Sequence, residues 1–293
     1  MSPQRNGALT TARDLSSMVK IAHTVFALPF AAAAVLLALD RPHVPLTAWR
    51  LGAMLVCMVA ARTAAMAYNR YVDRDIDAKN PRTLAREIPR GRVSPRTALG
   101  LTALMSALFV ASAATLGFWP ALLAPPVLVV LLGYSWTKRF TWGSHFVLGL
   151  ALALAPGGAW IAMGARPEPA ILALMLAVIT WTAGFDILYS LQDEAFDREQ
   201  GLFSIPARFG TGMAVAMSAA LHVVTAAAIF ACGAWLGRGT AYYAGAALVA
   251  ALLVYEHAIV GRGNLDKVNT AFFDVNGYVS CGFLLLTAWD TLV

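Results

Sequence analysis

The stretch LGAMLVCMVAARTAAMAYNRYVDRDIDAKNPRT, residues 51–83, begins as a long apolar run and ends in a cluster of charge. Its first part has the length and composition of a membrane-spanning helix. Its last part places four ionisable side chains within five positions: Asp73, Arg74, Asp75 and Asp77. Carboxylates at the end of a membrane helix are costly and often mark a functional site. The stretch therefore predicts a helical membrane protein whose acidic side chains bind a ligand or an ion.

The composition of the whole chain agrees with a membrane location. Of 293 residues, 59% are hydrophobic and only 13% are charged, and the mean hydropathy is +0.66. A soluble domain carries roughly 25% charged residues. Long apolar runs dominate and the alternating pattern of a membrane barrel is absent, so we expect an all-α integral membrane protein. The basic residues behind the net charge of +6 fall in loops, and we expect no nucleic-acid partner.

Neither the beginning of the chain nor its cysteines indicate processing or cross-linking. The first 20 residues, MSPQRNGALTTARDLSSMVK, are polar and have no apolar signal-peptide core. Cys57, Cys232 and Cys281 all lie in apolar runs without paired spacing. We therefore expect neither a disulfide nor a metal role for them.

Apolar runs of about 20 residues predict nine transmembrane helices. The predicted ranges are 19–39, 49–70, 97–117, 120–137, 144–164, 169–190, 212–236, 240–260 and 270–291. The very short link GFWPA predicts that the third and fourth helices are antiparallel neighbours. We expect one membrane-embedded domain over residues 1–293, with two similar halves at about 19–137 and 144–260 followed by the ninth helix.

Lys and Arg are distributed unevenly between the two sets of predicted loops. The N-terminal segment and the loops on its side hold 17 of the 22 basic residues, and the opposite loops hold four. Because basic residues are enriched in cytoplasmic loops, we expect the N-terminus in the cytoplasm and the C-terminus outside. The acid-rich segments fall on the same cytoplasmic side.

The first acid motif consists of Asn69, Asp73 and Asp77, whose spacing of four stacks three oxygen-bearing side chains on one helical face. Such a row repels itself unless a cation lies among its members. Hard oxygen ligands without His or Cys nearby suit Mg²⁺. This ion usually takes one or two carboxylates and fills its other positions with water and phosphate oxygens. Asp75 lies off this face and is expected to be a surface charge.

A second motif follows the sixth predicted helix, in FDILYSLQDEAFDREQG. Its spacings of three and four predict one shared face for Asp186, Tyr189, Asp193 and Asp197. Asp193 lies 120 residues after Asp73, and both motifs end an even-numbered helix. If the two halves pack around a common centre, the acids face each other across one cavity. The alternative is that each cluster is a solvated helix end paired with nearby Arg; Glu194 and Glu199, off the shared face, are expected to be ordinary surface charges.

Basic and phenolic side chains flank both motifs. Arg82 and Arg86 are four apart in the loop after the first motif, and in a partly helical loop they would point the same way. Tyr134 and Lys138 are four apart at the end of the fourth helix. Arg suits bidentate phosphate contacts, so these groups beside metal-binding acids indicate a diphosphate. The alternative is ordinary positive-inside charge, and the absence of a Gly-rich phosphate loop disfavours nucleotide hydrolysis.

Together the two motifs resemble the paired signature of the UbiA superfamily of intramembrane prenyltransferases: Asn69-x3-Asp73-x3-Asp77 and Asp186-x2-Tyr189-x3-Asp193-x3-Asp197. RTLAREIPRGRVS (82–94) and FSIPARFG (203–210) resemble the flanking segments of the family, and the resemblance covers essentially the whole chain. It implies a UbiA-type bundle of nine helices around a central cavity, in a bacterial plasma membrane.

The resemblance also implies a reaction, in which Mg²⁺ stabilises the diphosphate of a polyprenyl donor as the allylic C–O bond ionises. An electron-rich aromatic ring then attacks the allyl cation in a chamber without water. The implied metal ligands are Asn69, Asp73, Asp77, Asp193 and Asp197. The implied catalytic residues are Asp73, Asp193, Asp186 and Tyr189. The implied diphosphate-binding residues are Lys20, Arg82, Arg86, Tyr134 and Lys138.

Arg62 and Asp186 carry separate expectations about the acceptor. Arg62 lies two turns deeper than Asn69 on nearly the same face, where a buried Arg normally faces a cavity or a partner. In the resembling family an Arg at this place is near the acceptor carboxylate, so we expect Arg62 to bind that carboxylate. The alternative is a structural ion pair. Asp186 could position Lys138 or Tyr189, or act near the acceptor hydroxyl.

The segments HTVFALPFA, DILYSLQDEAFDREQGLFSIPARFG and VNGYVS resemble the 4-hydroxybenzoate polyprenyltransferase branch, and especially a sub-branch that serves menaquinone through the futalosine route. The acceptor of that sub-branch would be a dihydroxy-naphthoate, and the sequence separates neither the ring systems nor the tail lengths. The implied partners are the polyprenyl diphosphate, a small aromatic acceptor and the bilayer, without an organic cofactor or obligate protein partner. Remoter alternatives are a haem or chlorophyll prenyltransferase and a Mg²⁺ or anion transporter, although acids at one rim favour a capped chamber over a through-path.

Overall fold

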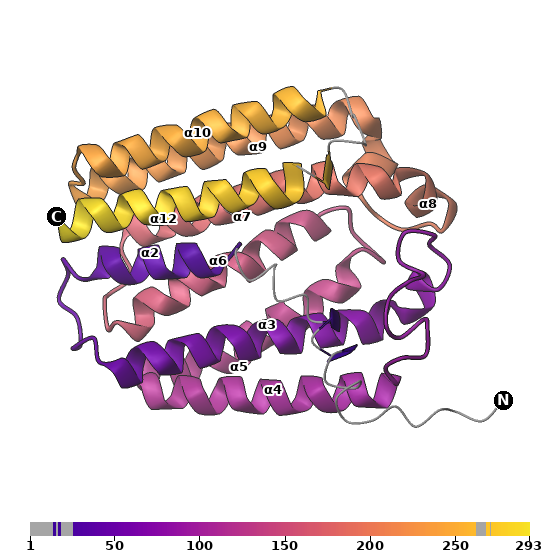
Figure 1. Ribbon diagram of the computed structural model, residues 1–293, viewed down its shortest axis with the longest axis horizontal. Helices are drawn as coiled ribbons and strands as arrows, with labels where there is room; N and C mark the ends of the chain where they lie inside the picture. The colour runs from indigo at the N-terminus through magenta and orange to yellow at the C-terminus, as the bar shows by residue number, and fades with distance from the viewer. Residues whose placement is uncertain (1–13, 16, 19–25, 262–267, 270) are drawn as a thin grey trace.

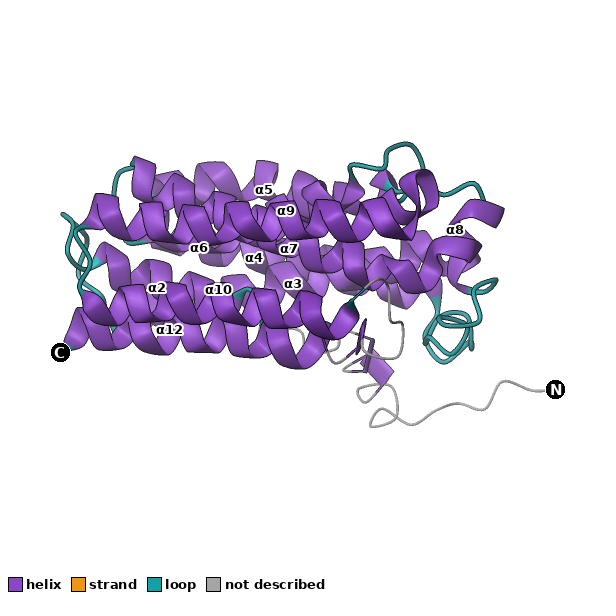
Figure 2. Ribbon diagram, turned by 90° about the horizontal axis from the view of Figure 1, so that it is seen from above, coloured by secondary structure: helices purple, strands orange, loops and turns teal. Residues whose placement is uncertain are grey.

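The computed structural model describes residues 14–15, 17–18, 26–261, 268–269 and 271–293. Its long helices run lengthwise between two ends of a bundle (Figure 1 and Figure 2). The helices are α2 (Leu28–Ala38), α3 (Ala48–Asp77), α4 (Pro95–Leu116), α5 (Phe118–Thr137), α6 (Ser144–Ala162), α7 (Pro169–Ser190), α8 (Glu194–Glu199), α9 (Ile205–Leu236), α10 (Thr240–Val260) and α12 (Asn276–Leu292). A 3₁₀ turn, η2 (Leu191–Asp193), joins α7 to α8, and a π-helical turn, η3 (Ala271–Val275), precedes α12.

The number of membrane helices agrees with the sequence. Within the described residues, eight helical segments are long and apolar enough to cross a membrane, α8 being counted with α7 and η3 with α12. The shorter α2, with 11 residues, makes the ninth. The prediction of an all-α membrane bundle of nine helices is thus confirmed for this part of the chain. The first predicted helix began at residue 19, and its positions 19–25 lie outside the described residues.

Helix boundaries differ from the predicted ones at two places that matter for the site. α3 continues seven residues past its predicted end to Asp77, so the first acid motif lies inside one unbroken helix. α9 begins at Ile205 rather than at residue 212, and it is kinked at Gly210, whose φ of 81° favours glycine. The predicted range therefore corresponds to the part of α9 after the kink, and the short segment 205–209 precedes it. The link between α4 and α5 shrinks to Gly117, and the two helices pack together as predicted.

Both acid motifs come to the same end of the bundle. Figure 1 shows α8 and the loop that follows α3 next to each other at one end, while the C-terminus lies at the other. α7 leads to this end as the central helix, because it packs against α6 and α9 and is buried along most of its span. Large buried side chains fix it there, including Trp181, Trp160 and Phe30. Residues near the end of α7 are consequently held on a rigid support.

Close contact of α6 with α7 depends on Gly149, and this gives a stability prediction. A Cβ at this position would lie 2.4 Å from the backbone oxygen of Ile179, which cannot move away as a flexible side chain could. Gly149→Ala should therefore destabilise the protein by about 1–3 kcal/mol through overpacking. Gly158→Ala is the matched control on the same helix, since a Cβ there meets nothing within 4 Å. Thermal unfolding in detergent measures both, and an equal effect of the two substitutions would refute the close approach.

Candidate active site

Asp73 is a buried carboxylate of the first motif. It is 2% exposed, and Lys138 places its Nζ 2.7 Å from Oδ2. Arg139 contributes Nη2 at 3.1 Å from the other oxygen, Oδ1. Asn69, one turn earlier, donates from Nδ2 to Oδ2 at 3.1 Å. Two helix ends therefore meet at this carboxylate, because Lys138 and Arg139 directly follow α5 while Asp73 belongs to α3.

Asp77 ends α3 and is held by the loop that follows it. Arg86 donates from Nη1 to both carboxylate oxygens, at 2.7 and 2.8 Å. Thr83 donates its hydroxyl to the Asp77 backbone oxygen at 3.2 Å, which folds the loop back over the helix end. Asp77 is 2% exposed, and Arg86 neutralises the charge of this buried carboxylate.

Asp193 receives its partners from the other half of the chain. Arg82 forms a two-pronged ion pair with it, with Nε 2.9 Å from Oδ1, and Asn80 donates from Nδ2 to the same oxygen at 2.9 Å. Arg82 also donates to the Tyr189 hydroxyl at 2.8 Å and lies over its ring. Burial lowers the pKa of Arg82, but the hydrogen bonds and charge of Asp193 outweigh it and raise the pKa above its ordinary value. Arg82 therefore stays charged while it bridges the two motifs.

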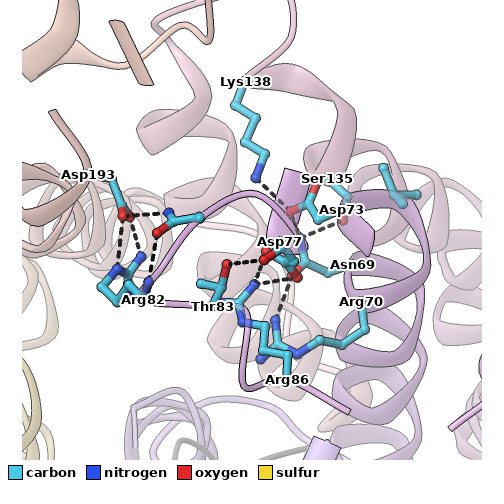
Figure 3. A network of polar contacts seen from close by, with 12 residues as sticks. Asn69, Arg70, Asp73, Asp77, Arg82, Thr83, Arg86, Ser135, Lys138 and Asp193 are labelled. Atoms are coloured by element: carbon cyan, nitrogen blue, oxygen red, sulfur yellow. Dashed lines mark hydrogen bonds and ion pairs between the residues drawn. The ribbon is translucent and has the colours of Figure 1, made fainter. Parts of the chain in front are cut away.

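The pairing distinguishes between the two interpretations of the acid clusters. Figure 3 shows Asp193 with Arg82 on one side, Asp73 and Asp77 with Arg86 on the other, and Thr83 between the two groups. Arg82 and Asp193 are 111 residues apart in the chain, so Asp193 is not a helix end paired only with a neighbouring Arg. Three carboxylates share four cations from two loops, namely Arg82, Arg86, Lys138 and Arg139. The result is one site with surplus positive charge, which favours an anionic ligand.

The backbone differs from the one that two side-chain predictions assumed. The second motif does not lie on one continuous helix, because α7 ends at Ser190 and the 3₁₀ turn η2 precedes α8. A 3₁₀ turn has three residues per turn, so the α-helical spacing rule does not by itself place Asp197 on the face of Asp186. Arg82 and Arg86 do not point the same way, since they reach different carboxylates. The loop between them is built of turns rather than a helix, so the spacing of four carries no helical meaning there.

Deeper in the bundle, Arg62 has no hydrogen-bond or ion-pair partner among the described residues. Its Nε is buried, and no hydrogen bond or ion pair links it to any described residue. The predicted alternative of a structural ion pair therefore finds no counterion in the described part of the chain. Arg62, Arg70, Asp73 and Asp186 all lie within electrostatic range of Tyr134 on α5. Tyr134 thus lies between the acid motifs and the deeper part of the bundle that contains Arg62.

Asp186 interacts with a residue that had no predicted role. His145, in the first turn of α6, has Nδ1 2.7 Å from Asp186 Oδ2. Neither Lys138 nor Tyr189 is hydrogen-bonded to Asp186 in the described residues. The contacts therefore give no support to the first alternative, that Asp186 positions one of them, and leave the second, a role near the acceptor hydroxyl. The imidazole is 3% exposed and takes that place because α6 starts beside α7.

The remaining predicted residues are placed as follows. Asp197 accepts a hydrogen bond from Ser204 and lies within electrostatic range of Asp193 and Lys138. Lys20, predicted to bind diphosphate, lies outside the described residues. Sequence reasoning missed five contributors to the site: Arg70, Asn80, Ser135, Arg139 and His145. Arg70, Ser135 and Arg139 could have been found, since each directly follows a residue that was singled out. Asn80 and His145 contact acids far away in the sequence, and no local signal marks them.

Arg70 shows how the first motif is arranged. It is 4% exposed and donates from Nη1 to the Asn69 side-chain oxygen at 3.2 Å, while its buried Nε has no hydrogen-bond partner in the part of the chain that the structure describes. The Asn69 amide nitrogen consequently faces Asp73 and Ser135. In this arrangement Asn69 is a hydrogen-bond donor to Asp73, and its oxygen faces a guanidinium.

Residues 27–279 match the UbiA prenyltransferase family. The 4-hydroxybenzoate octaprenyltransferase of Aeromonas salmonicida is 30% identical over 229 residues, which are 78% of this chain and 78% of that protein. The corresponding protein of Aromatoleum aromaticum is 32% identical over 222 residues, 74% of each chain. The solved apo structure of a UbiA homologue from Aeropyrum pernix K1 is 36% identical with a TM-score of 0.83, over 92% of this chain and 98% of that one.

A second solved structure agrees in fold. A UbiA homologue from Archaeoglobus fulgidus, bound to GPP and Mg²⁺, has a TM-score of 0.76 and 20% identity over 96% of this chain and all of that one. The fold and the family match define this protein as a membrane-embedded prenyltransferase. The chain belongs to the UbiA prenyltransferase family, and the resemblance stated from its motifs is confirmed.

Proposed function

We propose that this prenyltransferase transfers a polyprenyl group from a polyprenyl diphosphate to a ring carbon of a hydroxylated aromatic acid of the 4-hydroxybenzoate type, in quinone biosynthesis. The observation that carries the proposal is the joining of two acid motifs through Arg82 and Asn80 into one cationic site. The relatives from Aeromonas salmonicida and Aromatoleum aromaticum are both named as 4-hydroxybenzoate octaprenyltransferases, and these names support a hydroxylated aromatic acid as the acceptor.

The basic side chains of the site can exchange their carboxylate partners for the phosphate oxygens of a diphosphate. Each of Asp73, Asp77 and Asp193 is held by a Lys or Arg that can turn to a phosphate oxygen instead. Arg makes bidentate contacts to phosphate. A diphosphate carries several negative charges, so it can take over these cations and leave the carboxylates available. The cations thereby pass from holding acids to holding the leaving group.

The oxygen donors also fit Mg²⁺. Asp73 and Asp77 present carboxylates one helical turn apart, with Asp193 on the opposite side of the loop (Figure 3). In the described residues no group of three His, Cys, Asp or Glu side chains could hold a metal by itself. Mg²⁺ usually binds one or two carboxylates together with phosphate oxygens and water, so we expect it to enter with the diphosphate. When bound, it would supply Lewis-acid stabilisation of the departing diphosphate.

The acceptor is assigned to the region below this charged rim. Arg62 is a buried cation without a counterion in the described residues, and a carboxylate on the acceptor would neutralise it. In the reaction, the allylic C–O bond breaks with its electron pair going to diphosphate, and the aromatic ring carbon forms the new C–C bond. The apolar helices α3, α5 and α7 around Tyr134 exclude water that would otherwise trap the allyl cation.

We propose that the charged end faces the cytoplasm of a bacterial cell, as the basic loops indicate. Lys20, in the N-terminal segment, would then be close enough in sequence to α2 to add a cation to the diphosphate site. The two predicted halves, at about 19–137 and 144–260, would each supply one acid motif. The bilayer around the bundle would hold the polyprenyl tail.

The direct test is product identification. Membranes carrying the protein are supplied with Mg²⁺, a polyprenyl diphosphate and one acceptor at a time, and the product is identified by mass. The expected product is 4-hydroxybenzoate with one polyprenyl group on a ring carbon, and excess chelator should abolish it. A protein that forms it equally well in chelator would contradict the metal assignment.

The same assay separates the other candidates. A dihydroxy-naphthoate is also a carboxylated hydroxy-aromatic, so Arg62 serves either acceptor and relative kcat/KM decides between them. A product formed only from a haem or chlorophyll precursor would replace the proposed acceptor class. Flux of Mg²⁺ or anions through proteoliposomes, without diphosphate release, would instead indicate a transporter.

A further inference from the structure

Asp186 and His145 form a pair that the diphosphate site does not use. Asp186 is near the end of α7, and only its Oδ2 is hydrogen-bonded within the described part of the chain, to His145 Nδ1 at 2.7 Å. Its side chain is 24% exposed, so the other oxygen is accessible. We propose that His145 is a positioning residue, which holds Asp186 so that this free oxygen accepts the hydroxyl proton of the aromatic acceptor. The inference rests on the proposed function.

The tautomer of His145 follows from its second contact. The backbone N–H of Ile205 donates to Nε2 at 3.3 Å, and a backbone N–H cannot accept. Nε2 must therefore carry a lone pair, and the single proton of the neutral imidazole is on Nδ1. Nδ1–H donates to Asp186, as in a carboxylate that is oriented by a histidine. Both ring nitrogens of His145 are consequently engaged, Nδ1 with Asp186 and Nε2 with Ile205. Asp186 is therefore the member of the pair that can accept a proton from the acceptor.

The support behind His145 is rigid. Ile205 is fully buried and packs with Ile187 and Leu188 of α7, while Ser204 caps the start of α9. Phe203, two residues before Ile205, donates its backbone N–H to the Lys138 carbonyl at 2.8 Å. The short segment 203–205 therefore ties the imidazole to the residue that binds Asp73. This connection fixes the position of the Asp186–His145 pair relative to Lys138 and Asp73.

The location suits the hydroxyl end of a small aromatic acid. Arg62 and Asp186 both lie within electrostatic range of Tyr134, so a ring whose carboxylate is bound by Arg62 is in the same region as Asp186. When Asp186 takes the hydroxyl proton, the oxygen lone pair enters the ring as the C–C bond to the allylic carbon forms. The resulting dienone then loses its ring hydrogen as a proton to the departed diphosphate, and the oxygen recovers the proton from Asp186. The one proton released overall thus ends on the diphosphate, and the step balances.

Three substitutions of His145 separate positioning from packing. His145→Asn places an amide N–H where Nδ1 was and can still donate to Asp186. His145→Gln places its amide near the Nε2 position and cannot, and His145→Phe keeps the ring volume without any donor. The full-length protein is assayed in detergent or proteoliposomes for kcat of transfer, for KM of polyprenyl diphosphate, and for diphosphate release without acceptor.

His145→Phe and His145→Gln should lower kcat of transfer roughly 10- to 100-fold, because misplacing a reacting group by 1 Å costs about that much. KM for polyprenyl diphosphate and the acceptor-free release of diphosphate should change by less than about twofold, since neither involves Asp186. His145→Asn should recover most of the rate. An acceptor whose hydroxyl is already ionised at the assay pH should also lessen the defect.

Other results would overturn the inference. His145→Phe turning over at the wild-type rate would show that Asp186 needs no such support. A parallel loss of diphosphate release would indicate a general structural role. If His145→Phe does not fold, the comparison of Asn with Gln decides, and equal activity of these two variants would also reject positioning. Absence of transfer by the unmodified protein would instead reject the proposed function and leave the pair's role outside this reaction.

Discussion

Asp73→Asn should lower kcat for prenyl transfer by roughly 10³-fold, the size of effect seen when charge stabilisation of a transition state is lost. Asparagine keeps the shape of the side chain, but it lacks the negative charge that would help hold Mg²⁺ beside the diphosphate. The substitution also leaves Lys138 and Arg139 without their carboxylate, so we expect the free energy of unfolding to fall as well. Initial rates with a saturating acceptor measure the first effect, and thermal unfolding measures the second.

Asp75→Asn is the matched control for this prediction. Asp75 lies on the same helix two residues away, but its side chain is 81% exposed, and among the described residues it pairs only with Arg74, at 3.5 Å. It should keep wild-type activity. The double variant Asp73→Asn/Lys138→Gln separates folding from catalysis, because it removes one unpaired cation and should regain stability without regaining activity. Retention of a large part of the activity in Asp73→Asn would refute the assignment of this carboxylate.

Arg62→Met should raise KM for the aromatic acceptor about 10- to 100-fold, which corresponds to the loss of one charged hydrogen bond. KM for polyprenyl diphosphate should stay near the wild-type value. The substitution is also expected to preserve or raise thermal stability, because Arg62 has no hydrogen bond or ion pair with the described residues and its charge is costly in a membrane span. A loss of catalytic efficiency without a loss of stability would be the signature of a ligand-binding cation.

Arg74→Met on the same helix is the control, since Arg74 contacts only Tyr71 and Asp75 at the surface in the described part of the chain. A neutral phenol that lacks the carboxylate provides a second control. Wild-type protein and Arg62→Met should use it equally poorly, so the two changes are not additive. A rise in KM for polyprenyl diphosphate rather than for the acceptor would place Arg62 in the other subsite.

Much of the fold could be predicted because membrane insertion depends on local composition. A run of about 20 apolar residues is favourable in a bilayer whatever its neighbours are, so the number of helices followed directly from the sequence. Helix ends were less certain, as α3 shows, since its last two turns carry the charged residues of the first motif. Polar residues end an apolar run, but they do not end a helix whose backbone bonds continue.

The candidate site was only half predictable for a related reason. The residues of the first motif lie on one helix, so a spacing of four sufficed to place Asn69, Asp73 and Asp77 on one face. The second motif crosses a change from α-helix to 3₁₀ turn, and the same spacing rule does not by itself apply there. A helical period applies only while the helix continues, and the spacing was extended past residue 190, where both the predicted helix 169–190 and α7 end.

The sequence by itself determined that the chain is a helical membrane protein with two acid motifs, because hydrophobicity and helical spacing are sums over neighbouring residues. Only the tertiary structure decided which charges meet. Arg82 reaches Asp193 over 111 positions, Lys138 reaches Asp73 over 65, and His145 reaches Asp186 over 41. These pairings depend on how each helix is rotated and packed against the next, which is set by contacts between whole helices rather than by residue spacing.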